Sequence, residues 1–156
     1  MAVDAKTGQP IFHGATSVGL RSVGSYQVSG WPHLTGGVIP VDGEVRIDWP
    51  WVTKSITVAA SSSTETMTGD LRVHFCSTAS STNVLEHHHY WSLSNHEDAL
   101  TMDIKTTRLF LSTVGATAGD DVGFQIMAEM TQIPSGSMWE ITGSGHTDVP
   151  FAGHGS

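Results

Sequence analysis

Short runs of alternating apolar and polar residues, separated by Ser, Thr, Gly and Asp clusters, constrain this chain more than any other feature. In the run 44–49, for example, Val45, Ile47 and Trp49 alternate with polar residues. A period of two is typical of a β-strand with one buried face. Further strands are predicted over 26–30, 52–59, 71–76, 88–93, 100–105, 108–113 and 122–130. The gaps are too short for crossover helices, so the sequence predicts an all-β fold, a single antiparallel β-sandwich or jelly-roll-like domain.

The two ends of the chain differ in composition from its middle. Residues 1–25 are rich in Gly and Ser and are expected to form an extended arm, and residues 143–156 a Gly-rich tail. The sandwich is expected to fill residues 26–142. Its first strand, 26–30, is predicted to end at Trp31-Pro32, because proline cannot donate to a strand ladder. A last short strand is expected around Trp139 and Ile141.

The surface is expected to carry little charge. Only 14% of the 156 residues are charged, and 15 acids against 7 Lys and Arg give a net charge of -8. Few charges would keep neighbouring molecules apart, which favours close protein–protein packing. Nucleic acid is excluded as a partner, because phosphate backbones are bound by clustered Lys and Arg. No stretch is apolar for long enough to span a bilayer, and the N-terminal residues lack a signal peptide's apolar region, so no membrane partner is expected.

The sequence offers no set of residues that would supply a nucleophile, a base and oxyanion donors together. We therefore expect no enzymatic activity and no cofactor. The single cysteine, Cys76, cannot form an internal disulfide, and alternation places it beside His74. Such a pair can activate a thiolate, but a small packed side chain is the more common role of a strand cysteine.

Histidines gather in the middle of the chain, where Glu86-His87-His88-His89 is followed by His96. If these segments paired as a hairpin, His87, His89 and His96 would be candidate metal ligands. The spacing fits no established metal motif, so no metal site is predicted. A solvated patch of histidines, or a contact that responds to pH, is the alternative.

Large aromatic residues are the best candidates for contacts with other proteins. Trp31, Trp49 and Trp51 flank prolines at predicted strand ends. Aromatic side chains commonly anchor subunit interfaces. The residues predicted to form an interface are Phe12, Trp31, Trp49, Trp51 and Trp139. Because indole faces also stack on sugars, carbohydrate binding is an alternative role for them.

Several segments, in the same order along the chain, resemble small β-rich structural proteins of tailed bacteriophages, especially those that infect marine cyanobacteria. They are Val23–Gly30, Val52–Val58, Leu71–Phe75, His89–Leu93, Ala128–Pro134 and Thr142–Gly145. The resemblance implies a virion component that is assembled in the host cytoplasm, and it implies no catalytic residues.

Together these observations lead us to expect a capsid decoration (cement) protein that stabilises a phage head by non-covalent contacts. Its partners would be the major capsid protein or other virion proteins, and it would form a homo-oligomer, with a trimer favoured. A tail, neck or baseplate component is one alternative. A carbohydrate-binding module that attaches to the host surface is another.

Overall fold

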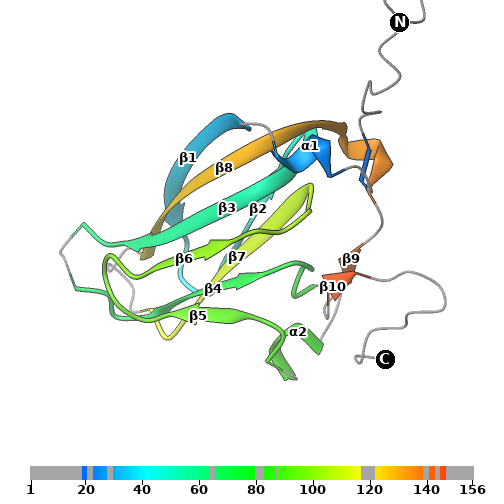
Figure 1. Ribbon diagram of the computed structural model, residues 1–156. Coiled ribbons are helices and arrows are strands. Elements are labelled where there is room, and N and C mark those ends of the chain that lie inside the picture. Colours follow the sequence, from blue (N-terminus) through cyan, green and yellow to red (C-terminus); the bar gives the residue numbers. More distant parts are fainter. Residues whose placement is uncertain are drawn as a thin grey trace, which may run out of the picture.

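The fold is an antiparallel β-sandwich, as the sequence predicts (Figure 1). The computed structural model describes residues 19–20, 23–27, 30–63, 66–79, 83–86, 88–116, 122–138, 141–142 and 145–146. The first sheet has the order β1 (Trp31–Ile39), β8 (Val122–Pro134), β3 (Trp51–Ser61) and β6 (Ala99–Met102). The second has the order β2 (Glu44–Asp48), β7 (Arg108–Val114), β4 (Asp70–His74) and β5 (Trp91–Leu93).

This strand order is that of an eight-stranded jelly roll. The chain crosses between the sheets at the connections β1–β2, β2–β3, β3–β4, β5–β6, β6–β7 and β7–β8. The connection β4–β5 stays within the second sheet, where the two strands pair. Each sheet therefore contains strands far apart in the sequence, which is the mark of two interlocked Greek keys.

Among the described residues, two short α-helices, a 3-10 turn and a small ribbon lie outside the two four-stranded sheets. They are α1 (Gly24–Gln27), α2 (Asn83–Glu86), the 3-10 turn η1 (Ser135–Ser137), β9 (Ile141–Thr142) and β10 (Gly145–His146). β9 pairs with β10 in an antiparallel ribbon, so ordered structure continues beyond residue 142. Residues 1–18, most of the predicted arm, lie outside the described residues, as do residues 147–156 of the predicted tail.

The predicted first strand is wrong. Residues 24–27 form a helical turn, and β1 begins at Trp31, where the sequence predicts the end of a strand. Pro32 lies inside β1, opposite Glu129 of β8. This is tolerated because β1 is an edge strand, where a proline nitrogen can face away from the ladder. The predicted strand 88–93 is also too long, since β5 contains only Trp91–Leu93.

The core lies between the sheets, where the alternating residues of the predicted strands meet. Its fully buried side chains include Ile56, Leu71, Leu109, Leu111 and Ile126. β7 is buried on both faces, because Phe110 and Ser112, which point away from the core, are also covered. The outer face of the second sheet is therefore not a free surface at its centre.

Candidate functional site

Three tryptophans meet at one end of the first sheet. Trp31 opens β1, and Trp49 and Trp51 flank the turn between β2 and β3. The rings of Trp31 and Trp51 lie edge to face with centroids 5.9 Å apart. The ring of His33 meets that of Trp49 in the same way at 6.4 Å. The structure thus brings together three of the five residues predicted to form an interface.

These tryptophans differ in what they offer to a partner. Trp49 is only 3% exposed and belongs to the core, so it supports the cluster from within. Trp51 is half-buried, and Trp31 is 53% exposed. Trp31 is therefore the tryptophan of this cluster that is most available for contact. The other two predicted interface residues, Phe12 and Trp139, lie outside the described residues.

Exposed apolar side chains also lie on the outer face of the first sheet, the face opposite to the one from which Trp31 projects beside Met130. Leu34 and Val38 of β1 are 77% and 55% exposed, and Met127 of β8 is 50% exposed. Leu34 and Met127 are register partners, so their side chains lie side by side. A charged pair on this sheet is Lys54 and Glu129, whose Nζ and Oε2 atoms are 3.3 Å apart.

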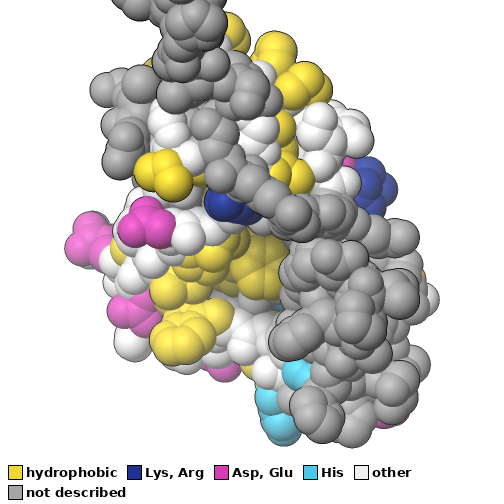
Figure 2. Space-filling view, turned by 45° about the vertical axis from the view of Figure 1, so that its right-hand side comes forward, with side chains coloured by type: hydrophobic (Ala, Val, Ile, Leu, Met, Phe, Trp, Pro, Cys, Tyr) yellow, Lys and Arg dark blue, Asp and Glu magenta, His cyan; other side chains and the backbone are white. Residues whose placement is uncertain are grey.

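Sequence reasoning missed Leu34 and Val38 because it ended the strand at Pro32. One signal could have found them: the run 31–39 contains no Lys, Arg, Asp or Glu. A long strand without charge is unusual at the edge of a sheet, where charges normally discourage pairing with other chains. Figure 2 shows one face of the molecule, on which hydrophobic side chains gather near the centre with acidic side chains to their left.

A buried polar network lies on the outer face of the second sheet. The His74 side chain is fully buried in the middle of it and stacks on the ring of Phe110. Its Nε2 atom is 2.9 Å from the Ser112 hydroxyl, and its Nδ1 atom is 2.7 Å from the carbonyl oxygen of Cys76. The Glu44 carboxylate lies 4.0 Å from Nε2. Both ring nitrogens of His74 thus have partners within the protein.

Burial and hydrogen bonding move the pKa values of this network in a consistent way. Burial lowers the pKa of His74 below its ordinary value of 6.5, despite the hydrogen bond to Cys76 and the charge of Glu44. Burial alone would raise the pKa of Glu44. The hydrogen bonds donated by Ser77 and by the Thr78 backbone outweigh it, and the pKa lies below its ordinary value. The network is therefore a neutral imidazole beside a carboxylate.

This network ties the segment after β4 onto the sheet. Glu44 of β2 accepts from Ser77 at 2.6 Å and from the backbone N–H of Thr78 at 2.7 Å. In the predicted Cys–His pair, the Nδ1 atom of His74 contacts the backbone carbonyl oxygen of Cys76. A contact of this kind does not activate a thiolate. Ser112 is 6% exposed and His74 has no exposed surface, so a substrate has no access to the Ser112 hydroxyl or the His74 ring. The arrangement is suited to a structural role.

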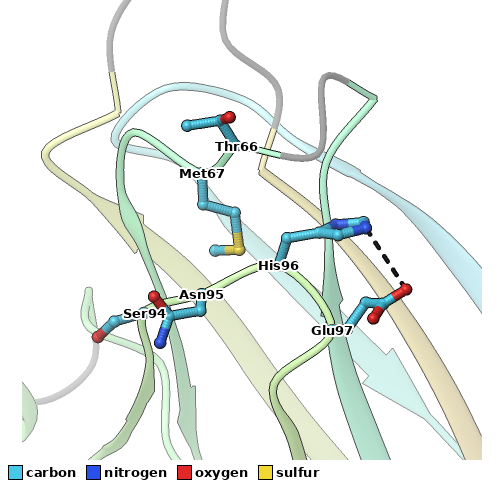
Figure 3. Close-up of a pocket in the computed structure, with 6 residues that line it drawn as sticks. All are labelled: Thr66, Met67, Ser94, Asn95, His96 and Glu97. Atoms are coloured by element: carbon cyan, nitrogen blue, oxygen red, sulfur yellow. Dashed lines mark ion pairs between the residues drawn. The ribbon is translucent and has the colours of Figure 1, made fainter.

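A shallow pocket lies between the loop after β3 and the loop after β5 (Figure 3). It encloses about 430 Å³ and is lined by Thr66, Met67, Ser94, Asn95, His96 and Glu97. His96 accepts a hydrogen bond from the Ser62 backbone N–H through Nδ1 at 3.0 Å. Its Nε2 atom lies 3.8 Å from the Glu97 carboxylate. The loop holds its shape because the Asp98 carboxylate accepts from Asn95 and Ser94.

The two described candidate metal ligands, His89 and His96, do not lie on paired strands. His96 lies in the connection between β5 and β6, which belong to different sheets, and His89 precedes β5. His96 lines the pocket, His89 donates its backbone N–H to Val84, and His87 lies outside the described residues. Among the described residues, no three His, Cys, Asp or Glu side chains are grouped so that they could hold a metal ion.

Comparisons with known proteins give no identification. No protein-family model matches the sequence, and no curated protein matches it. In the part of the chain that the structure describes, no helix has the length and apolar character needed to cross a membrane. Function must therefore be argued from the fold and the surface.

Proposed function

We propose that this chain is a structural protein of a bacteriophage virion and that it decorates the head shell. The observation that carries the proposal is an eight-stranded jelly roll whose first sheet exposes apolar side chains at Trp31, Leu34 and Val38. Jelly rolls occur in viral capsid domains, in lectins and in cupins, so the fold alone leaves these functions open. The scarcity of charge and the resemblance in sequence favour a particle protein.

In this role the protein stabilises the shell by covering junctions between subunits. Its partners are the major capsid protein or other virion proteins, and it acts as a homo-oligomer. Trp31 is the expected anchor, because its ring is 53% exposed and is held edge to face by Trp51. A preorganised aromatic side chain loses little conformational entropy on binding, and such residues often dominate an interface.

Counting copies in purified particles tests the head location. The protein is quantified by mass spectrometry against the major capsid protein of the virus that encodes it. A decoration protein is expected in hundreds of copies per particle. A few copies, in one or several rings, would place it in the tail, neck or baseplate instead. Its absence from washed particles would contradict a virion role.

Binding to shells assembled without the protein tests the contact surface. Trp31→Ala is expected to weaken binding about tenfold or more, as the loss of an interface anchor does. Trp91→Ala is the matched control, because Trp91 is 60% exposed but belongs to the second sheet. Equal effects of the two substitutions would contradict a contact through the first sheet.

Carbohydrate binding is a second candidate, favoured by the exposure of Trp91, which is 60% exposed. This exposed indole follows Tyr90, whose ring is covered by the Arg72 guanidinium at 4.3 Å from the ring centroid. An exposed indole can stack on a sugar ring and donate one hydrogen bond to it. Binding on a glycan array that Trp91→Ala abolishes would support this function. An array without any bound glycan would contradict it.

A further inference from the structure

We propose that β1 is a contact between two copies of this chain, and that the two β1 strands pair antiparallel about a two-fold axis at Gly36. β1 is an edge strand: β8 pairs with one side of it, and no described strand pairs with the other. It is nine residues long and carries no charge. This contact rests on the geometry of β1 alone and does not depend on a role in a virion.

The direction of the free backbone groups follows from Pro32. A proline in a strand is tolerated where its nitrogen faces away from the ladder. Because N–H groups point alternately to the two sides of a strand, Leu34, Gly36 and Val38 direct their N–H and C=O groups toward the open edge. The position of the Phe124 carbonyl agrees, since it lies 2.9 Å from a Cβ built on Gly36 and thus points toward β1.

The residues around Gly36 match each other under a two-fold axis. When Gly36 faces the partner's Gly36, Leu34 lies opposite the partner's Val38, and both are exposed apolar side chains on the outer face. Trp31 then lies toward the partner's Val41, which is 42% exposed in the single chain.

The same register places Pro32 opposite the partner's Pro40, at the two ends of the paired strands. Neither proline is then needed as a donor in the middle of the new ladder. A register shifted by one residue would place an outward side chain opposite an inward one, which antiparallel pairing does not allow. A shift of two residues would separate Leu34 from the partner's Val38. The sequence 31–41 therefore specifies one centre, and that centre fits a second copy of the same strand.

Charge also favours a second copy at this surface. Two molecules that each carry a net charge of -8 repel each other, so a self-contact must form where charge is lacking. Side chains of the outer face near the axis are neutral: Leu34, Val38, Gln125 and Met127. Met127 and Leu34 of one copy and Val38 of the partner would then lie next to one another in a single apolar row across the axis.

The mass of the full chain in solution, measured by sedimentation over a wide range of protein concentration, tests the contact. The wild type is expected to form a dimer of the 16.6 kDa chain. Leu34→Lys is expected to weaken dimerisation about tenfold, because each dimer would lose two apolar cross-strand pairs between Leu34 and the partner's Val38. Leu85→Lys is the control, since Leu85 is an exposed leucine of α2, outside the sheet. A monomer at every concentration, a trimer, or equal effects of both variants would overturn the proposal.

A mixture of Leu34→Lys and Val38→Glu chains tests the register. In the mixed dimer, the introduced lysine of one chain faces the introduced glutamate of the other, and on the opposite side of the axis the wild-type pair is kept. Mixing is therefore expected to give a tighter dimer than either variant forms alone. If a variant fails to fold, amide exchange in the wild type decides: protection of Leu34, Gly36 and Val38 must increase with protein concentration. Pairing centred on Gly36 is contradicted if mixing the two folded variants does not strengthen dimerisation. It is also contradicted if the protection of these three amides does not increase with protein concentration.

Discussion

His74 makes the stability of this fold depend on pH. Its pKa is lowered by burial, so the folded protein keeps it neutral at a pH where the unfolded chain already binds a proton. The free energy of unfolding therefore falls as the pH is lowered below about 6.5, with a slope of at most about 1.4 kcal/mol per pH unit for one group. Glu44, whose pKa is also lowered, contributes stability above about 4.5 that is lost on further acidification.

Urea unfolding between pH 7.5 and pH 5.5 measures this dependence. The wild type is expected to lose stability toward pH 5.5, whereas His74→Asn should show a smaller loss over the same range. The variant is expected to be less stable at pH 7.5, because Asn fills less of the buried site. An unchanged slope in His74→Asn would show that His74 does not set this pH dependence.

Ser112 is expected to be the residue of this network whose loss can be measured most directly. Ser112→Ala leaves the buried Nε2 atom of His74 without its partner at 2.9 Å and should cost about 1–3 kcal/mol of unfolding free energy. Ser92→Ala is the matched control on the same sheet, because the Ser92 hydroxyl bonds Asp70 at a half-buried position. Its expected cost is below about 1 kcal/mol. Equal costs would mean that the His74 site relaxes or admits water.

At the scale of the element, β1 offers a test of which way its backbone faces. Leu34→Pro removes an N–H that points to the open edge and should change the stability of the monomer by less than about 1 kcal/mol. Thr35→Pro removes an N–H that bonds β8 and should cost about 3 kcal/mol or more. Thermal unfolding of dilute protein compares the two variants. A larger cost for Leu34→Pro than for Thr35→Pro would reverse the assigned direction of the strand.

The sequence predicts those strands best in which one face is buried and the other is solvated. Glu44–Asp48 and Trp51–Ser61 are examples, and both are found close to their predicted bounds. β1 escapes prediction for a physical reason: a proline normally ends a strand, and only the position of β1 at a sheet edge allows it to remain. The edge position of β1 follows from its pairing with β8, which is about ninety residues away in the sequence. The local sequence cannot show such a pairing.

The candidate site could be predicted only in part, because local alternation does not identify partners across a sheet. Trp31, Trp49 and Trp51 stand out by their size and by the prolines beside them. Ser112, in contrast, reaches His74 only because β7 pairs with β4 in one register. Alternation places Cys76 near His74, but it cannot show that the contact is made by the backbone carbonyl.

At the scale of the whole molecule, the two sheets have different surfaces. The outer face of the second sheet is polar and partly covered, with His74 and Ser112 buried in a network that fixes the segment after β4. The outer face of the first sheet is exposed and apolar at β1 and β8. A protein built in this way can keep one sheet rigid while the other makes contacts. This asymmetry is what a two-fold dimer through β1 would use.

Net charge sets how such a dimer should respond to salt. Each copy carries a charge of -8, while the contact itself contains apolar side chains and backbone hydrogen bonds. Salt therefore screens the repulsion between the copies and leaves the contact almost unaffected. Dimerisation measured by sedimentation at pH 7.5 is expected to become tighter as the ionic strength rises from about 0.01 M to about 0.15 M. The mixed Leu34→Lys and Val38→Glu dimer gains an ion pair in the contact, which salt weakens, so its affinity should rise less. A wild-type dimer that salt dissociates would show that ion pairs hold it, and the contact would then have to lie on a surface other than β1.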